Sequence, residues 1–113
     1  MSKLEKLISL DGVLAAFEFN PSGELQDSSI AEQAKIESDV LDMLCHVCVA
    51  NGAIATMQAR GWEKMTKMEG FYPVQGISLI GFEWTVIVND RFGVIVANDK
   101  VDYDGTYAVL DES

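Results

Sequence analysis

Residues 40–59 read VLDMLCHVCVANGAIATMQA, a helical pattern that is apolar nearly all the way round. One side of this helix carries Leu41, Leu44, Cys48 and Ala55, and a neighbouring side carries Val40, Met43, Val47, Ala50 and Ile54. A helix that rests on a single sheet needs only one apolar stripe, about 100° wide. We therefore expect this helix to be covered on a second side as well.

A second copy of the same chain is the simplest second cover, because a short chain has little other material for it. A two-fold dimer is the commonest arrangement of that kind. The small residues Ala50, Gly52, Ala53 and Ala55 would let two helices approach closely. The predicted dimer-interface residues are Val40, Met43, Val47, Ala50, Ile54 and, from a strand, Trp84. The alternative is a monomer in which the N-terminal helix and residues 62–73 cover the same face.

The sequence predicts a long helix around this stretch. Ser29 and Glu32 have the spacing of a capping box, which marks a helix start, and no proline follows before about Met68. A straight helix of that length would measure roughly 58 Å. A compact chain of this size has a radius of gyration of only about 13 Å. We therefore expect a break at Gly61 or a bend at residues 51–52.

The flanking segments predict one short helix and several strands. Ser2 and Glu5 form a second capping-box pattern, before a short helix that ends at residues 11–12. Strands are expected at 13–19 and 24–27, joined by the turn Asn20-Pro21-Ser22-Gly23, and then at 77–80, 83–88 and 94–97, with a weak last strand at 106–110. This order predicts an α+β fold in which a long helix covers an antiparallel sheet.

Composition limits the classes of function. The chain has 113 residues, enough for one domain spanning 1–113, and a net charge of −10. That charge argues against non-specific binding to nucleic acid and against an anionic membrane surface. The N-terminus lacks a signal-peptide pattern, and the charge-free stretch 43–59 is shorter than the ~20 apolar residues that span a bilayer. We expect a cytoplasmic protein with no membrane or nucleic-acid partner.

Cys45-His46-Val47-Cys48 is the one motif that suggests metal or redox chemistry. A reactive CxxC pair usually lies at a helix N-terminus, whereas this pair lies well inside the predicted helix. One chain supplies three potential ligands, Cys45, His46 and Cys48, and a structural zinc site needs four. Buried free cysteine is common in protein cores. Core packing is the favoured interpretation, and a metal or redox site formed across a dimer is the alternative.

No other pattern points to catalysis or to a cofactor. Residues 100–111 resemble a calcium loop, but Lys100 stands where the first oxygen ligand is required. His46 is the only histidine, and no partner for it is evident in the sequence. The hypothesis of an enzyme that uses acidic residues near the C-terminus has only the negative charge in its support. We therefore predict no catalytic residues, no cofactor and no enzymatic activity.

The order of elements resembles the roadblock (dynein light chain) superfamily. The resemblance lies in residues 3–16, KLEKLISLDGVLAA, in the hairpin segment 17–23, and in GFEWTVIV at 81–88 with the strand after Gly93. The same residues more closely resemble a family of small, functionally uncharacterised bacterial and archaeal proteins within that superfamily. The resemblance covers most of residues 3–97.

The resemblance implies a five-stranded antiparallel sheet with a long second helix, and homodimers that join sheets and helices across a two-fold axis. It also implies an adaptor or regulatory role, including partnership with small Ras-like GTPases or with another protein complex. It supplies no catalytic residue. The acidic tail around residues 102–105, with no evident third helix, departs from the superfamily pattern and weakens the expectation of a GTPase partner.

Overall fold

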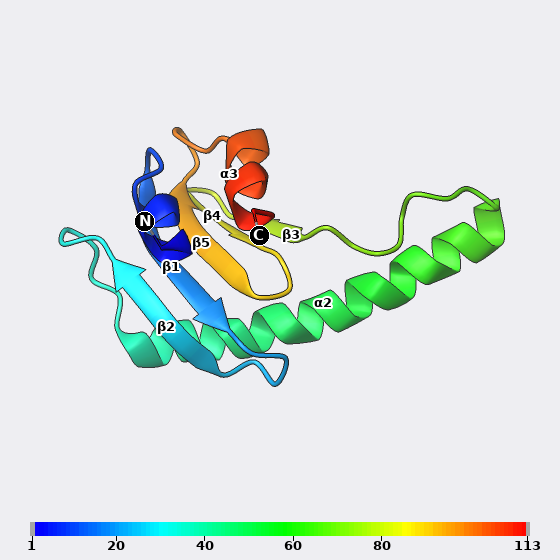
Figure 1. Cartoon of the computed structure of the whole chain (residues 1–113), viewed down its shortest axis with the longest axis horizontal. Helices are drawn as coiled ribbons and strands as arrows, with labels where there is room; N and C mark the ends of the chain where they lie inside the picture. The colour runs from blue at the N-terminus through cyan, green and yellow to red at the C-terminus, as the bar shows by residue number, and fades with distance from the viewer. Residues whose placement is uncertain (1, 113) are drawn as a thin grey trace.

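A computed structural model describes residues 2–112 and contains one five-stranded antiparallel sheet with three helices (Figure 1). The elements are α1 (Lys3–Ile8), β1 (Val13–Phe19), β2 (Leu25–Ile30), α2 (Ser38–Thr66), β3 (Ile77–Ile80), β4 (Trp84–Val88), β5 (Phe92–Ala97) and α3 (Tyr103–Leu110). The strand order is β2-β1-β5-β4-β3, so β2 and β3 form the two edges. The predicted α+β class and the five-stranded antiparallel sheet are confirmed.

The sheet separates two apolar cores because its central strands are buried on both faces. On one face, α1 and α3 pack Leu7 and Leu110 against Ile87 and Val94. On the other face, α2 packs its inner side against Phe17 and its neighbours. The short, capped α1 is also confirmed, since Ser2 and Glu5 form the predicted capping box.

The first hairpin is longer than expected, and this moves the start of α2. Gly23 closes the predicted turn by donating its N–H to the carbonyl of Asn20, at 2.9 Å. β2 then continues to Ile30, and Ser29 pairs with Ala16 of β1. The prediction that Ser29 caps the long helix is therefore wrong, because its backbone belongs to the sheet. The helix begins at Ser38.

α2 is one uninterrupted helix of 29 residues, so the predicted break at Gly61 is wrong. At 1.5 Å per residue it is about 44 Å long. The whole molecule measures 47 Å along its longest axis, and Figure 1 shows the C-terminal part of α2 extending beyond the sheet. The expectation assumed that the helix had to fit inside the domain. It fits by projecting from it, with open space beside both Gly52 and Gly61.

A side chain near the projecting end of α2 holds the segment that follows the helix. Lys67 adopts a left-handed conformation and ends the helix. The Glu63 carboxylate then accepts the backbone N–H groups of Gly70, Phe71 and Tyr72, at 3.0, 3.0 and 3.1 Å. Those hydrogen bonds hold the pKa of Glu63 below its usual value of 4.5, and the one from Tyr72 has the largest effect. One carboxylate therefore holds the start of the segment that returns to β3.

Glu63→Gln is expected to loosen residues 70–72, because a neutral amide is a weaker acceptor for three N–H groups. In the unchanged protein, the ionised Glu63 carboxylate stabilises the fold. Because its pKa is lowered, this stabilisation is fully present above pH 4.5 and is lost as the pH falls through the pKa of the folded protein. Hydrogen exchange of these amides, measured near neutral pH, should accelerate in Glu63→Gln. Amides that stay as protected as in the unchanged protein would contradict this assignment.

The C-terminal segment forms a helix, not the predicted weak strand at 106–110. Asp102 caps α3, and its carboxylate accepts the N–H of Gly105 at 3.0 Å. Thr106 and Leu110 are buried one turn apart, a helical spacing that holds α3 against the sheet. The residues that resemble a calcium loop thus form the N-cap and the body of α3. The third helix that seemed to be missing from the superfamily pattern is present.

Within the described residues, α2 is also the one helix that is long and apolar enough to cross a membrane, judged by length and composition alone. The sequence expectation that this region is too short is therefore wrong for the helix as folded. The core helix of a soluble protein passes the same test. What distinguishes α2 is that most of its apolar surface is left uncovered by its own chain.

Candidate interaction face

An exposed apolar stripe runs along the side of α2 that faces away from the sheet. Its large members are Val40, Met43, Val47, Ile54 and Met57, which are 58%, 71%, 44%, 54% and 73% exposed. Ala50, also exposed, completes the series. We call these six residues the α2 seam. They are separated by alternating steps of three and four, the spacing that lets two helices pack side by side.

The opposite side of α2 lies on the sheet. Leu41, Cys45, Cys48 and Ala59 are buried there. The sequence placed Leu44 and Ala55 on this stripe, but both are only half-buried, and Cys45 takes the central place. All five helix residues predicted for the interface are exposed in the single chain. Neither α1 nor residues 62–73 cover them, as the monomer alternative required.

A second apolar surface adjoins the β3 edge. Trp84, the strand residue predicted for the interface, is 47% exposed. Leu79 is exposed on the same face of the sheet as Trp84, whereas Ile80 is exposed on the opposite face and Phe82 on the turn that follows. The predicted interface residues did not include these three residues or Met57. Met57 had a usable signal, because it continues the three-and-four spacing of the seam.

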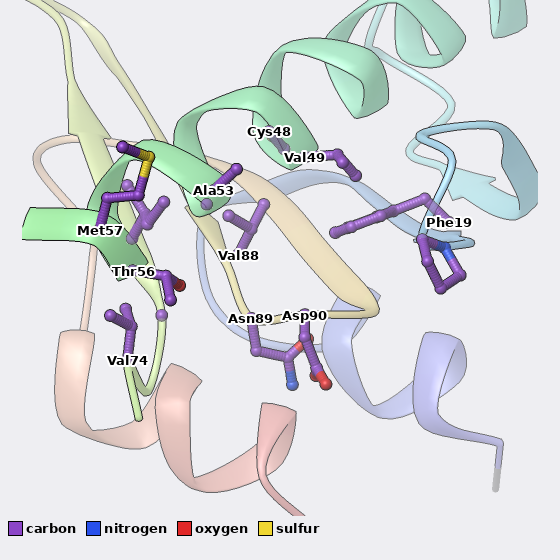
Figure 2. Close-up of a pocket in the computed structure, with 14 residues that line it drawn as sticks. Phe19, Cys48, Val49, Ala53, Thr56, Met57, Val74, Val88, Asn89 and Asp90 are labelled. Carbon is purple, nitrogen blue, oxygen red and sulfur yellow. The ribbon is translucent and has the colours of Figure 1, made fainter. Parts of the chain in front are cut away.

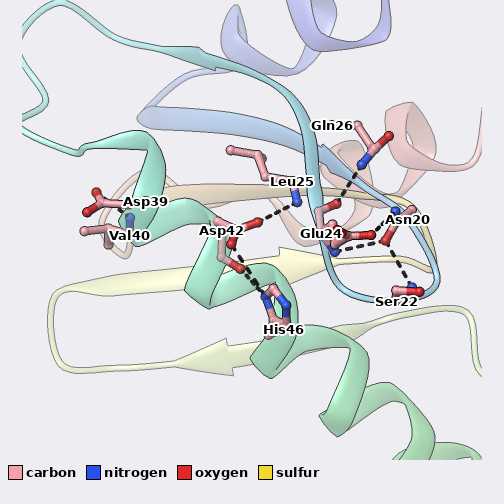
Figure 3. A network of polar contacts seen from close by, with 9 residues as sticks. All are labelled: Asn20, Ser22, Glu24, Leu25, Gln26, Asp39, Val40, Asp42 and His46. Carbon is pink, nitrogen blue, oxygen red and sulfur yellow. Dashed lines mark hydrogen bonds and ion pairs between the residues drawn. The ribbon is translucent and has the colours of Figure 1, made fainter.

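One side-chain hydrogen bond joins the first turns of α2 to the first hairpin (Figure 3). The Asp42 carboxylate accepts the N–H of Leu25 at 2.8 Å. One turn later, His46 lies with its Nδ1 2.8 Å from the carbonyl oxygen of Asp42. Asn20 organises the adjacent turn by accepting the N–H groups of Ser22 and Glu24. The start of α2 is thus tied to β2.

The two cysteines are core residues, and the histidine between them is not. Cys45 and Cys48 are 0% and 3% exposed, and burial raises the pKa of their thiols to about 12 and about 11. His46 is about half exposed and points away from them. Within residues 2–112, no group of three or more potential ligands is placed to hold a metal ion. Both thiols are neutral near pH 7, whereas metal binding and redox attack need the thiolate.

Both thiols are expected to react slowly with a thiol reagent in the folded protein at pH 8, and at once in denaturant. The reason is that burial both shields the sulfur atoms and keeps them protonated. A colorimetric thiol assay, run with and without denaturant, measures this directly. Cys45→Ala and Cys48→Ala would assign each thiol. One fast native thiol, or zinc bound at a fixed ratio, would favour the metal or redox alternative.

An apolar cavity of about 510 Å³ lies where α2 diverges from the sheet (Figure 2). Its walls come from α2, from the end of β1 and from the turn between β4 and β5. They include Phe19, Cys48, Ala53, Met57, Val88 and Asp90. The cavity thus lies on the side of α2 next to the seam, and Asp90 is the one charged residue among the described residues that line it.

Solved structures with the same arrangement define the class of fold. The Roadblock/LC7 domain from Streptomyces avermitilis superposes with a TM-score of 0.77 at 8% identity, over 96% of this chain and 85% of that chain. The gliding protein MglB from Thermus thermophilus gives a TM-score of 0.70 at 17% identity, over 98% and 87%. An MglB structure with a tetrameric arrangement gives 0.69 at 16% identity, over 96% and 85%. The chain has a roadblock-like fold.

The sequence itself assigns the family. Residues 3–112 match the family described as "Uncharacterized conserved protein (DUF2173)", and the chain belongs to that family. No curated protein sequence matches the chain. The fold provides the scaffold, and the exposed apolar surfaces on it are the features that bear on function.

Proposed function

We propose that this protein is a non-enzymatic interaction module of the regulatory or adaptor type, which acts as a homodimer. The α2 seam carries the proposal, because a long stripe of exposed apolar side chains on a rigid helix marks a protein–protein contact. A second copy presents the same seam, and its three-and-four spacing suits helix-to-helix packing. The MglB structure with a tetrameric arrangement shows that a protein of this fold self-associates.

We propose a second copy, not lipid, as the cover for the seam. The chain carries a net charge of −10, which opposes attachment to anionic membranes. The proposed setting is the cytoplasm, with no nucleic-acid partner, as the same charge suggests.

A further protein partner is part of the proposal. The superfamily resemblance suggests a small Ras-like GTPase or another regulatory complex. The presence of α3 removes the sequence-based objection to a GTPase partner, since the chain carries the full set of three helices. Affinity capture with the purified protein, followed by mass spectrometry, would test this. Recovery of a small GTPase would support the proposed partner class, and its consistent absence from the captured proteins would contradict it.

Sedimentation velocity of the purified protein at micromolar concentration tests the dimer. The expected result is a species of twice the 12.4 kDa chain mass. A stable monomer at that concentration would contradict the proposed function.

A further inference from the structure

The charges on α2 are divided between its two ends. Glu37, Asp39 and Asp42 lie at or near its N-terminal end, residues 43–59 carry no Asp, Glu, Lys or Arg, and Arg60, Lys64 and Lys67 lie at its C-terminal end. Two helices packed in parallel would place acid against acid and base against base. Antiparallel packing brings opposite charges together at both ends of the pair, and it also opposes the two helix dipoles.

Two of these charges lie on one flank of the α2 seam. Asp39 and Arg60 are 21 residues apart, which is three repeats of the seven-residue seam period. They therefore occupy equivalent positions beside the seam. Residues equivalent in this way face each other when two such helices run antiparallel. Antiparallel packing centred on Val47 and Ala50, the middle of the seam, brings Asp39 next to Arg60 of the second copy.

The Arg60 side chain is held in place by its own chain. Its guanidinium lies 4.4 Å from the centre of the Tyr72 ring, and one nitrogen donates to the Tyr72 hydroxyl at 2.8 Å. The nearby Glu63 carboxylate is occupied by the three N–H groups described above. Among residues 2–112, no carboxylate forms an ion pair with Arg60. A fixed and unpaired guanidinium is well suited to bind a carboxylate from another molecule.

The Asp39 side chain also lacks a charged partner in its own chain. Its carboxylate accepts only the N–H of the next residue, Val40, at 3.0 Å, and it is exposed at the start of α2 (Figure 3). No lysine or arginine in the described part of the chain pairs with it. Asp42, by contrast, is already used by Leu25. Of these two carboxylates on α2, Asp39 is the one free to reach a second copy.

We infer that Asp39 and Arg60 form two symmetric ion pairs between copies of this chain, and that these pairs set the antiparallel orientation and register of the α2 seam. The inference rests on the proposed homodimer and specifies what makes it selective. The apolar seam supplies affinity, whereas the charged flank distinguishes a correctly aligned copy from a shifted or parallel one.

Charge reversal tests the inference. Asp39→Arg and Arg60→Asp should each weaken self-association about tenfold or more, because each replaces two attractive contacts by two repulsive ones. The double variant Asp39→Arg/Arg60→Asp should recover most of the loss. An equimolar mixture of the two single variants should form a heterodimer, since both of its flank contacts then join opposite charges.

Asp104→Arg is the matched control for Asp39→Arg. It makes the same change in net charge on α3, which packs on the opposite face of the sheet. Because it only lowers the overall negative charge, it should leave self-association unchanged or slightly stronger. Weaker association of Asp39→Arg alone would then come from the local contact. Sedimentation equilibrium at several salt concentrations gives the dissociation constants, and the difference between variants should shrink as salt rises.

The outcomes separate the two proposals. A wild-type protein that stays monomeric overturns the proposed function. A wild-type dimer whose dissociation constant is unaffected by both single reversals overturns the ion pairs and leaves the dimer standing. If both single variants associate more weakly and neither the double variant nor the mixture recovers the association, the ion pairs are also overturned. Weakening in each single variant, with recovery in both combinations, supports the inference.

Discussion

Val47→Glu is expected to convert the proposed dimer into a folded monomer. Val47 lies at the middle of the α2 seam and is 44% exposed in the single chain, so a glutamate there reaches water when the chain is alone. In the dimer, two-fold symmetry would bury two unpaired carboxylates. Each uncompensated buried charge costs about 3–5 kcal/mol, so the dissociation constant should rise by on the order of a thousandfold or more.

Sedimentation velocity and far-ultraviolet circular dichroism together measure this effect. The variant should sediment as a monomer and keep the helical signal of the unchanged protein. Ala108→Glu is the matched control, because Ala108 is an exposed residue of α3 on the other face of the sheet. It adds the same charge and should leave the dimer intact. A Val47→Glu protein that remains dimeric would remove the α2 seam from the interface.

Phe17→Ala is expected to produce the largest loss of folding stability. Phe17 is fully buried on β1, beside Phe19 and opposite Gly93 of β5. A side chain on Gly93 would lie 2.5 Å from the Phe17 ring, so the ring fills the space that the glycine leaves. Removing a buried phenylalanine side chain costs about 3–5 kcal/mol. That is a large share of the roughly 5–15 kcal/mol that stabilises a typical domain.

Urea unfolding followed by circular dichroism measures this loss. The experiment is best done in the Val47→Glu background, where association does not add a concentration-dependent contribution to the free energy of unfolding. Met65→Ala is the control, because Met65 is 82% exposed and its truncation should change stability little. A loss below about 1 kcal/mol in Phe17→Ala would contradict the assigned core.

The sequence predicted those features that local patterns determine. The capping box at Ser2, the hairpin turn at Asn20 and the strands at 13–19 and 77–80 all follow from residue types at fixed spacing. The exposed helix residues of the predicted interface also follow from spacing, because a helix apolar on two sides cannot hide both on one sheet.

The errors arose where contacts distant in the sequence override local preference. Ser29 has the spacing of a helix cap, but pairing with Ala16 keeps it in a strand. Residues 106–110 have the composition of a strand, but the cap at Asp102 and the burial of Leu110 make them a helix. The expected break in α2 failed for another reason, since a compact shape was assumed for a chain whose main helix extends outside it.

In the proposed dimer, the overhang of α2 would make resistance to proteases depend on protein concentration. Beyond Ala59 the helix lies on no core of its own, and a short isolated helical segment is marginally stable in water. Arg60, Lys64 and Lys67, all cleavage points for trypsin-like enzymes, lie on this overhang. In the inferred register a second copy would shield Arg60, whereas a lone chain leaves all three open to digestion. Turnover would thereby remove chains that have found no counterpart and spare those already assembled.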